Sequence, residues 1–187
     1  LPFQELALRT GATLKWFDLD EEGRVRSDTA DEVITDRTKI VAVTHVGNTT
    51  GAITDIAPII RRAHEVGAVF VLDACQSVPH LKVDFHALDV DFAAWSAHKM
   101  YGPTGVGFLY GKREMLEALP PANFGGSMVE LAWMDQEAQY MEPPARFEAG
   151  TQPVAQVVAA GVAAEWLMNI GMEKLEAHER TITDELL

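Results

Sequence analysis

The sequence predicts an α/β fold, a three-layer α/β/α arrangement around a mainly parallel sheet. The segment Lys39–Thr44 is β-branched and apolar, Ile56–Val66 has the pattern of a helix, and Ala68–Leu72 is again continuously apolar. Strand, helix and strand in this order form a βαβ unit. Because both strands are apolar at successive positions, we expect helices to cover both faces of the sheet. Such connections are right-handed, and ligands bind at the carboxyl ends of the strands.

The residues before this unit are expected to form a helix, a strand and a second, short helix. The pattern predicts a helix over Leu1–Leu8 and a strand over Ala12–Leu19. Ser27 or Asp28 is an expected N-cap of a helix that runs through Ile34, since acidic residues in a first turn suit the helix dipole.

Start and stop signals define the helix of the βαβ unit and the elements that follow it. Asp55 is an expected N-cap, Pro58 is tolerated in the first turn, and Gly67 ends the helix. Two later strands are predicted over Asp91–Trp95 and Val106–Tyr110, followed by a short helix over Arg113–Leu119. Pro120–Arg146 is expected to be irregular, and two long helices are predicted over Val154–Ile170 and Glu173–Leu187.

Composition excludes several classes of protein. The 187 residues carry 15 Lys and Arg against 28 Asp and Glu, a net charge of −13, which argues against nucleic acid or an anionic membrane as partner. The single cysteine, Cys75, excludes an internal disulfide framework and predicts a reducing, cytoplasmic setting. No apolar run is long enough to span a bilayer.

Both ends of the sequence suggest a piece of a longer protein. The first residue is Leu1 rather than Met, and the last residues, Asp184–Leu187, lie in a helical pattern that has no cap. We therefore expect residues 1–187 to be a fragment of a longer protein.

Lys99 is the main candidate for chemistry. It follows the apolar run Asp91–Trp95 and precedes a turn rich in Gly and Pro, where backbone can approach a ligand closely. A lysine held there can form a Schiff base with a carbonyl compound. The alternative is a surface lysine in a turn.

Polar residues at other strand ends would lie on the same rim as Lys99. Asp73 follows the strand Ala68–Leu72 and can keep a pyridinium nitrogen protonated, or it can simply cap a turn. Ser96 and His98 precede Lys99, and a strand would place both on one side, where they can donate to a phosphate; the alternative for His98 is a structural histidine.

Other residues are weaker candidates. We interpret Cys75 as a small buried residue without a basic neighbour, rather than as a nucleophile. The residues His80, Asp84, His86 and Asp91 have the types of metal ligands but the spacing of no standard site, so we predict no metal. No P-loop, dinucleotide fingerprint or nucleophile elbow is found, which argues against a nucleotide-binding α/β enzyme, the competing class.

Residues 41–151 resemble the class V branch of fold type I pyridoxal-phosphate enzymes, and within it the cysteine desulfurases of the SufS type. Five segments carry the resemblance in matching order and spacing: Thr44–Asn48, Val71–Ser77, Ser96–Gly105, Gly125–Met128 and Arg146–Thr151. Thr104 and the segment Arg146–Thr151 are similar to the SufS branch rather than to the NifS and IscS branch.

The resemblance implies roles for the residues that match. Lys99 would bind pyridoxal 5′-phosphate covalently and move the proton. Asp73 would be the partner of the ring nitrogen, and Gln76 and Asn48 would contact the ring hydroxyl. Ser96 and His98 would be phosphate ligands. Thr151 would serve the phosphate site of the partner subunit. A homodimer follows from the last of these.

The resemblance also implies the reaction, conversion of L-cysteine to L-alanine with sulfur passed to a protein persulfide and on to an acceptor protein, for iron–sulfur cluster assembly or other uses. The persulfide cysteine and the arginine that binds the substrate carboxylate would lie beyond Leu187, and an amino-terminal segment and a small domain would also be missing. Cys75 does not match the persulfide cysteine. Selenocysteine lyases, epimerase-like enzymes and an inactive truncated domain stay open as alternatives.

Overall fold

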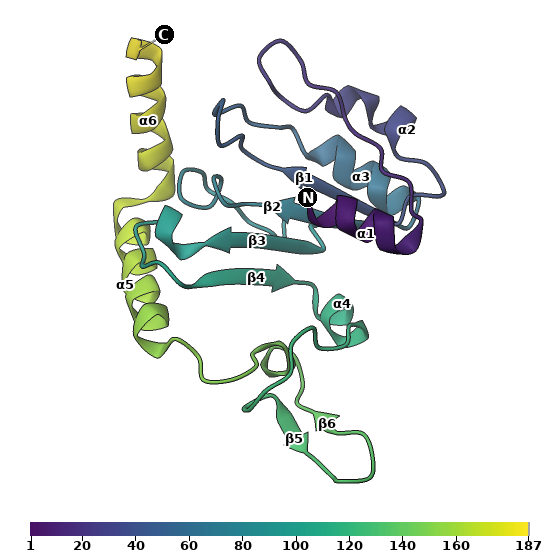
Figure 1. Cartoon of the computed structure of the whole chain (residues 1–187). Helices are drawn as coiled ribbons and strands as arrows, with labels where there is room; N and C mark the ends of the chain where they lie inside the picture. Colours follow the sequence, from purple (N-terminus) through teal and green to yellow (C-terminus); the bar gives the residue numbers. More distant parts are fainter. Residues whose placement is uncertain (187) are drawn as a thin grey trace. The chain divides into compact units, whose positions relative to one another are not determined.

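The structure is a computed structural model that describes residues 1–186 (Figure 1). It consists of two compact units, unit 1 over Leu1–Phe70 and unit 2 from Val71 onward. Strand β2 (Val69–Asp73) begins in unit 1 and continues in unit 2.

Unit 1 contains the first strand of the predicted βαβ unit, its helix and the start of its second strand. Its elements are α1 (Pro2–Thr10), the 3₁₀ helix η1 (Ser27–Thr29), α2 (Ala30–Val33), β1 (Ile40–Thr44), α3 (Ala57–Glu65) and the first residues of β2. The backbone N–H of Val69 donates to the carbonyl of Lys39 at 2.9 Å, which joins the start of β2 to the residue before β1. Apolar side chains of α3 and the strands, such as Ile59 and Phe70, are fully buried. The strand–helix–strand order is confirmed.

Two predictions in unit 1 are wrong. Residues 12–19 form no strand; only an isolated bridge joins Leu19 to Val25, and Trp16 stays 67% exposed. Apolar and β-branched residues form a strand only where a partner strand and a buried face are available. The strand β1 is buried on alternate residues, not continuously, so one face of it is exposed within unit 1.

The predicted caps of unit 1 also differ from those observed. No side-chain hydrogen bond caps η1 or α2, and the Asp28 carboxylate instead pairs with the Arg26 guanidinium at 2.6 Å. Asp55 does accept a hydrogen bond from the N–H of Ala57 at 3.2 Å, although the N-cap position itself is Ile56. The Arg26 guanidinium competes with the backbone N–H groups of the helix for the Asp28 carboxylate.

Unit 2 contains the rest of β2, β3 (Phe92–Ser96), the 3₁₀ helix η2 (Ala97–Lys99) and β4 (Gly107–Gly111). Strands β2 and β3 are parallel, and strands β3 and β4 are antiparallel. The sheet is therefore mixed, and helices flank it. The predicted α/β class is confirmed.

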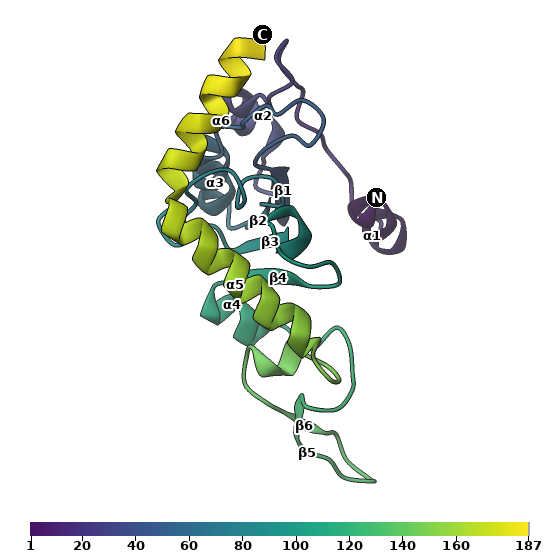
Figure 2. The same ribbon diagram turned by 90° about the vertical axis from the view of Figure 1, so that its left-hand side faces the viewer.

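The remainder of unit 2 contains a small hairpin and three helices. These elements are α4 (Arg113–Ala118), β5 (Val129–Leu131), β6 (Gln139–Tyr140), the 3₁₀ helix η3 (Ala145–Phe147), α5 (Val154–Ile170) and α6 (Met172–Leu186). The hairpin of β5 and β6 lies in the segment expected to be irregular. Helix α5 has the predicted bounds, and Figures 1 and 2 show it passing the end of the sheet where β3 runs into η2.

Helix α5 is apolar on nearly every side, yet only Ala160, Ala163 and Leu167 of it are buried. Among residues 1–186, no single helix is long and apolar enough to cross a membrane, although the bent pair of α5 and α6 passes the same test of length and composition together.

Candidate functional site

Two neighbouring strand ends place polar side chains at one edge of the sheet in unit 2. Asp73 is the last residue of β2, and Ser96 is the last residue of β3. The strands are parallel, and Asp73 is paired in register with Ala94, two residues before Ser96. The sequence prediction that these residues share a rim at the carboxyl ends of the strands therefore agrees with the register.

Cys75 connects the two strand ends. Its backbone N–H donates to Oδ1 of Asp73 at 3.0 Å, so this carboxylate also closes a turn, the alternative that the sequence left open. The thiol lies 3.9 Å from the hydroxyl oxygen of Ser96 and 3.9 Å from the carbonyl of Ala94. The side chains of β2 and β3 thus meet around a half-buried cysteine.

Burial and three neighbouring side chains affect the pKa of the Cys75 thiol. Burial raises the pKa of the Cys75 thiol above its usual value, and the Asp73 carboxylate adds to this effect, whereas Ser96 and the charge of Lys99 act in the opposite direction. The thiol therefore stays protonated at neutral pH and is a poor nucleophile. The charge of Lys99 has the weakest of these effects on the thiol.

The turn that carries Lys99 is fixed by backbone hydrogen bonds. Lys99 ends η2, and its side chain is half-buried. The carbonyl of Ala97 accepts from the N–H groups of Met100 and Gly102, both at 2.9 Å, and the N–H of Ala97 donates to Val106 at 3.1 Å. A side chain at position 102 would place its Cβ 2.9 Å from the Ala97 carbonyl oxygen, so the turn requires Gly102.

Tyr101 adds a contact that the sequence did not predict. Its backbone has the left-handed φ of 62°, which is uncommon for a residue with a side chain. Its ring packs edge-on against Trp166 of α5, with ring centroids 5.3 Å apart. The contact holds the Lys99 turn against α5. A strained residue cannot be recognised from sequence, so no local signal would have identified this pair.

The predicted pairing of Ser96 and His98 on one side of a strand is wrong. The strand ends at Ser96, and His98 lies in the 3₁₀ helix η2, where its side chain is exposed. Side chains alternate between faces only in an extended strand, and a 3₁₀ helix turns once every three residues. His98 therefore lies beside Lys99 in η2 and not on the same face of a strand as Ser96.

Two further candidates lie in turns. Gln76 is half-buried in the turn after β2. Asn48 belongs to unit 1 and is exposed in a loop after β1. Backbone hydrogen bonds between Gly47 and Gly51 and between Gly47 and Ala52 close this loop.

Thr151 lies in a different part of unit 2, exposed, shortly before α5. The N–H of the preceding Gly150 donates to the carbonyl of Gly126 at 2.8 Å, and Gly150 has a left-handed φ of 87°. The Gly125–Gly126 turn and the Gly150–Thr151 segment, which the resemblance grouped by role, therefore lie side by side.

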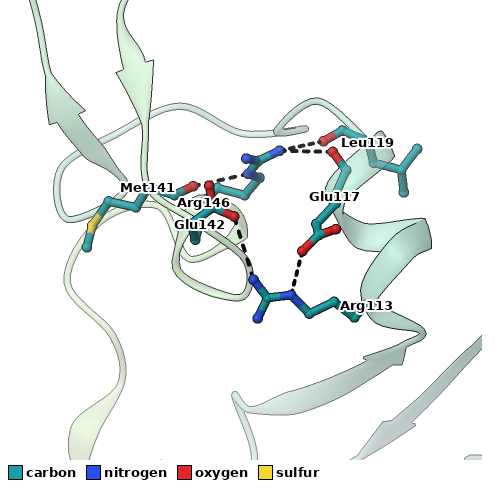
Figure 3. Close-up of polar contacts among 6 residues, drawn as sticks. All are labelled: Arg113, Glu117, Leu119, Met141, Glu142 and Arg146. Atoms are coloured by element: carbon teal, nitrogen blue, oxygen red, sulfur yellow. Dashed lines mark hydrogen bonds and ion pairs between the residues drawn. The ribbon is translucent and has the colours of Figure 1, made fainter.

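Arg146 ties the segment before Thr151 to helix α4. Its guanidinium donates to the carbonyl oxygens of Met141, Glu117 and Leu119, at 3.1, 3.3 and 3.5 Å (Figure 3). Arg146 lies in a segment that carries the family resemblance, but the resemblance implies no role for it. A cation whose partners are all backbone carbonyls cannot be recognised from the sequence, because every residue has a carbonyl.

The candidate metal ligands do not gather. Within residues 1–186, no group of three or more His, Cys, Asp or Glu side chains could hold a metal ion. His80 instead places Nδ1 2.9 Å from Oε1 of Glu179, a residue of α6.

The family model for class V aminotransferases matches residues 1–187. The chain belongs to this family. It is 50% identical over 182 residues to a probable cysteine desulfurase 2 of Mycobacterium leprae, and 48% identical over 184 residues to a probable cysteine desulfurase of Streptomyces coelicolor. These alignments cover 97% and 98% of this chain, but 43% and 44% of the relatives.

Solved structures show the same similarity. The cysteine desulfurase CsdA of Escherichia coli matches with a TM-score of 0.89 and 39% identity, over 92% of this chain and 43% of that one. The cysteine desulfurase of Thermococcus onnurineus NA1 matches with a TM-score of 0.93 and 34% identity, over 98% of this chain and 46% of that one. The chain thus spans less than half the length of these relatives. The predicted family and fold are confirmed.

Proposed function

We propose that this chain is the cofactor-binding part of a pyridoxal-phosphate-dependent cysteine desulfurase of the SufS type. The observation that carries the proposal is the edge of the sheet in unit 2. There a carboxylate and a hydroxyl at the ends of two parallel strands meet around Cys75, and Lys99 follows the second strand at the end of η2, in a chain that is 50% identical to a probable cysteine desulfurase.

The residues present fit pyridoxal phosphate. Asp73 offers a carboxylate and Ser96 a hydroxyl, and both contact Cys75; Lys99, three residues after Ser96, offers an amine. The turn after Lys99 contains Gly102 and Gly105, where the backbone can come close to a ligand. A charged ring nitrogen, an aldehyde and a phosphate would each find a chemical partner in this set.

Asp73 and Lys99 have the central roles in this proposal. When bound, the cofactor supplies an aldehyde that condenses with amines and a ring that withdraws electrons from the substrate's α-carbon. The Asp73 carboxylate holds a proton on the ring nitrogen, which preserves that electron demand. Lys99 Nζ takes the proton from the α-carbon of the amino-acid substrate and returns it later. The turn between Ala97 and Gly102 fixes the backbone from which the Lys99 side chain extends.

The remaining predicted residues orient the cofactor. Ser96 and His98 donate hydrogen bonds to its phosphate, and Gln76 and Asn48 contact its ring hydroxyl. Thr151 completes the phosphate site of a partner subunit. A homodimer is therefore part of the proposal.

The sulfur leaves the substrate by attack of a protein thiolate on the sulfur atom of L-cysteine. The carbon–sulfur bond breaks, its electron pair stays with carbon, and protonation of that carbon yields L-alanine; the protein thiol becomes a persulfide. Cys75 is unsuited to this attack because its pKa is raised and its thiol is half-buried. We propose that another cysteine of a longer polypeptide receives the sulfur and passes it to an acceptor protein in the cytoplasm, for iron–sulfur cluster assembly.

The domain assignment belongs to the same proposal. Residues 1–187 would be the central part of the large cofactor-binding domain. The relatives exceed this chain by more than its own length, which leaves room for an amino-terminal segment and a small domain.

The test is to load the longer protein with pyridoxal phosphate, reduce it with borohydride and map the modified lysine. We expect the label on Lys99, and Lys99→Ala to remove both the label and the release of alanine from L-cysteine. Lys82→Ala, which changes an exposed lysine of the same unit, is the matched control. A label retained in Lys99→Ala would overturn the assignment, and alanine formation from selenocysteine but not from cysteine would favour a selenocysteine lyase.

A further inference from the structure

The guanidinium of Arg146 joins two segments of unit 2 that are distant in the chain. Nη1 donates to Glu117 and Leu119 at the end of α4, and Nε donates to Met141, the residue after strand β6 (Figure 3). The last carbonyls of a helix have no partner within the helix, and a cation at this end also interacts favourably with the helix dipole. Arg146 thus satisfies backbone groups that would otherwise need water.

A short, bonded path leads from Arg146 to Thr151. Arg146 lies in the 3₁₀ helix η3, where Phe147 and Glu148 donate to the carbonyls of Pro144 and Ala145 at 3.0 and 3.1 Å. Two residues later, the N–H of Gly150 donates to Gly126 at 2.8 Å. The segment from Arg146 to Thr151 is therefore held at its start by the guanidinium and near its end by one backbone hydrogen bond.

Arg113 provides a comparison within the same cluster. Its guanidinium contacts only side chains in the described residues, with 2.5 Å between Nε and Oε1 of Glu117 and 3.7 Å between Nη2 and Oε2 of Glu142 (Figure 3). Arg113 is 65% exposed, and ion pairs of this type contribute little to stability. The two arginines thus differ in their partners: Arg146 binds backbone carbonyls, whereas Arg113 binds exposed side chains.

We propose that Arg146 is a positioning residue that fixes the Gly150–Thr151 segment, so that Thr151 can bind the phosphate of the cofactor in the partner subunit. This inference rests on the proposed function, since it needs the cofactor and the dimer. It adds a residue that acts on the site of the other protomer without touching the cofactor. Arg146→Ala releases three carbonyls, and Arg146→Lys keeps the charge but cannot reach both segments with one planar group.

The variant is expected to bind cofactor more weakly. We expect Arg146→Ala to weaken cofactor binding about tenfold in the dimer of the longer protein, since hydrogen bonds to charged groups contribute on this scale. The cofactor affinity of Arg146→Lys should lie between those of Arg146→Ala and the wild type. The cofactor affinity of Arg113→Ala should stay within about twofold of that of the wild type. Equal effects of Arg146→Ala and Arg113→Ala would overturn the proposal.

Mixed dimers separate positioning across the interface from loss of fold. In the first pairing, one protomer carries Arg146→Ala and the other carries Lys99→Ala, so the single remaining Lys99 faces a Thr151 whose Arg146 is intact. In the second pairing, one protomer carries both changes, so the remaining Lys99 faces the Thr151 of the altered protomer. The readout is cofactor affinity at the remaining Lys99, measured by borohydride labelling over a titration of pyridoxal phosphate.

We expect wild-type affinity in the first pairing and the tenfold loss in the second. Equal affinity in the two pairings would overturn the inference. A loss in the first pairing alone would also overturn it, because a fold defect would act on the Lys99 of the altered protomer itself. If Arg146→Ala does not fold, the same two pairings are made with Arg146→Lys. A wild-type dimer that carries no cofactor on Lys99 would instead overturn the proposed function, so the two failures are distinguishable.

Discussion

Two segments of unit 2 carry the proposed cofactor contacts, and they are held in different ways. The first, from Asp73 to Gly105, is built on strands whose neighbours are paired in register, and residues such as Ala74, Ala93 and Ala97 within it are fully buried. The second, from Gly125 to Thr151, is mostly exposed and depends on a two-strand hairpin, Arg146 and single backbone bonds.

The difference teaches which part of the site tolerates change. The sheet segment is stabilised by buried area and by many backbone hydrogen bonds, so the loss of one exposed contact should leave it in place. The exposed segment has few buried contacts, so one arginine can decide its conformation. In the proposed dimer, the first segment would serve its own cofactor and the second the partner's.

The largest expected effect on stability comes from breaking a buried ion pair of the sheet segment. Asp91 is 1% exposed, and its Oδ1 lies 2.8 Å from Nζ of Lys112, which also contacts Asp89. Burial lowers the pKa of Lys112, but the bonds to Asp89 and Asp91 outweigh burial and raise it. Lys112→Met would remove the ammonium that pairs with the buried Asp91 carboxylate, and we expect a loss of about 2–3 kcal/mol in the free energy of unfolding.

Urea unfolding of Lys112→Met checks this, with Lys82→Met as control. Lys82 pairs with Glu173 at the surface, so its replacement should cost less than about 1 kcal/mol. Equal losses would show that the sheet segment is not held by its buried pair.

The second effect concerns the turn after Lys99. Gly102→Ala would bring a Cβ to 2.9 Å from the Ala97 carbonyl oxygen and 3.1 Å from its Cβ, so the backbone must shift. We expect a loss of about 1–3 kcal/mol and weaker labelling of Lys99 by pyridoxal phosphate.

Gly126→Ala is the matched change in the exposed segment. A Cβ at position 126 meets no atom within 4 Å, so stability should change by less than about 0.5 kcal/mol. Thermal unfolding and borohydride labelling of both variants make the measurement. A larger effect at Gly126 than at Gly102 would reverse the comparison of the two segments.

The third effect is smaller and tests the contact between the Lys99 turn and α5. Trp166 is half exposed, and an edge-on ring pair contributes about 0.5–1.5 kcal/mol beyond its buried area. Trp166→Ala should speed hydrogen exchange of the amides around Tyr101, whereas Trp166→Phe should preserve their protection. Unchanged exchange in Trp166→Ala would show that backbone bonds alone hold the turn.

The smallest expected effect lies in unit 1, outside both segments. Nδ1 of His45 is buried and has no hydrogen-bond partner among residues 1–186, and burial lowers the pKa of the imidazole below its usual value. Protonation therefore favours the unfolded chain, so the contribution of His45 to stability is present above the unfolded pKa of about 6.5 and is lost as the pH falls toward the folded value.

His45→Phe cannot be protonated, so its melting temperature should fall less than that of the wild type between pH 7.5 and pH 5.5. The expected difference is about 2–4 °C. The same fall in both proteins would remove His45 as a cause of acid sensitivity.

Strong local patterns were sufficient to predict most elements. Helix α5 was predicted with its observed bounds, and the strands were predicted to within one residue, because each is a short apolar run between polar turns. The strand expected over Ala12–Leu19 is absent, and the short strands β5 and β6 were missed. Both errors have one cause: a strand exists only with its partner, and the partner is not part of the local pattern.

The site was predicted in part. The residues at the strand ends were identified, since a polar residue after an apolar strand is visible in the sequence. The position of His98 was wrong, because η2 interrupts the strand alternation on which it relied. The contacts of Tyr101 and Arg146 were missed, since one involves a strained backbone and the other involves only carbonyl groups.

The sequence by itself determined the α/β class, the family, and the lysine after the third strand, because these depend on apolar runs and on motifs of adjacent residues. Only the tertiary structure decided that Asp73 and Ser96 meet around Cys75, that the Cys75 thiol is kept protonated, and that Arg146 holds the end of α4. These features depend on distances between residues that are 20 to 30 positions apart in the chain. Strand register, burial and helix ends set those distances, and none of the three is a property of a local stretch of sequence.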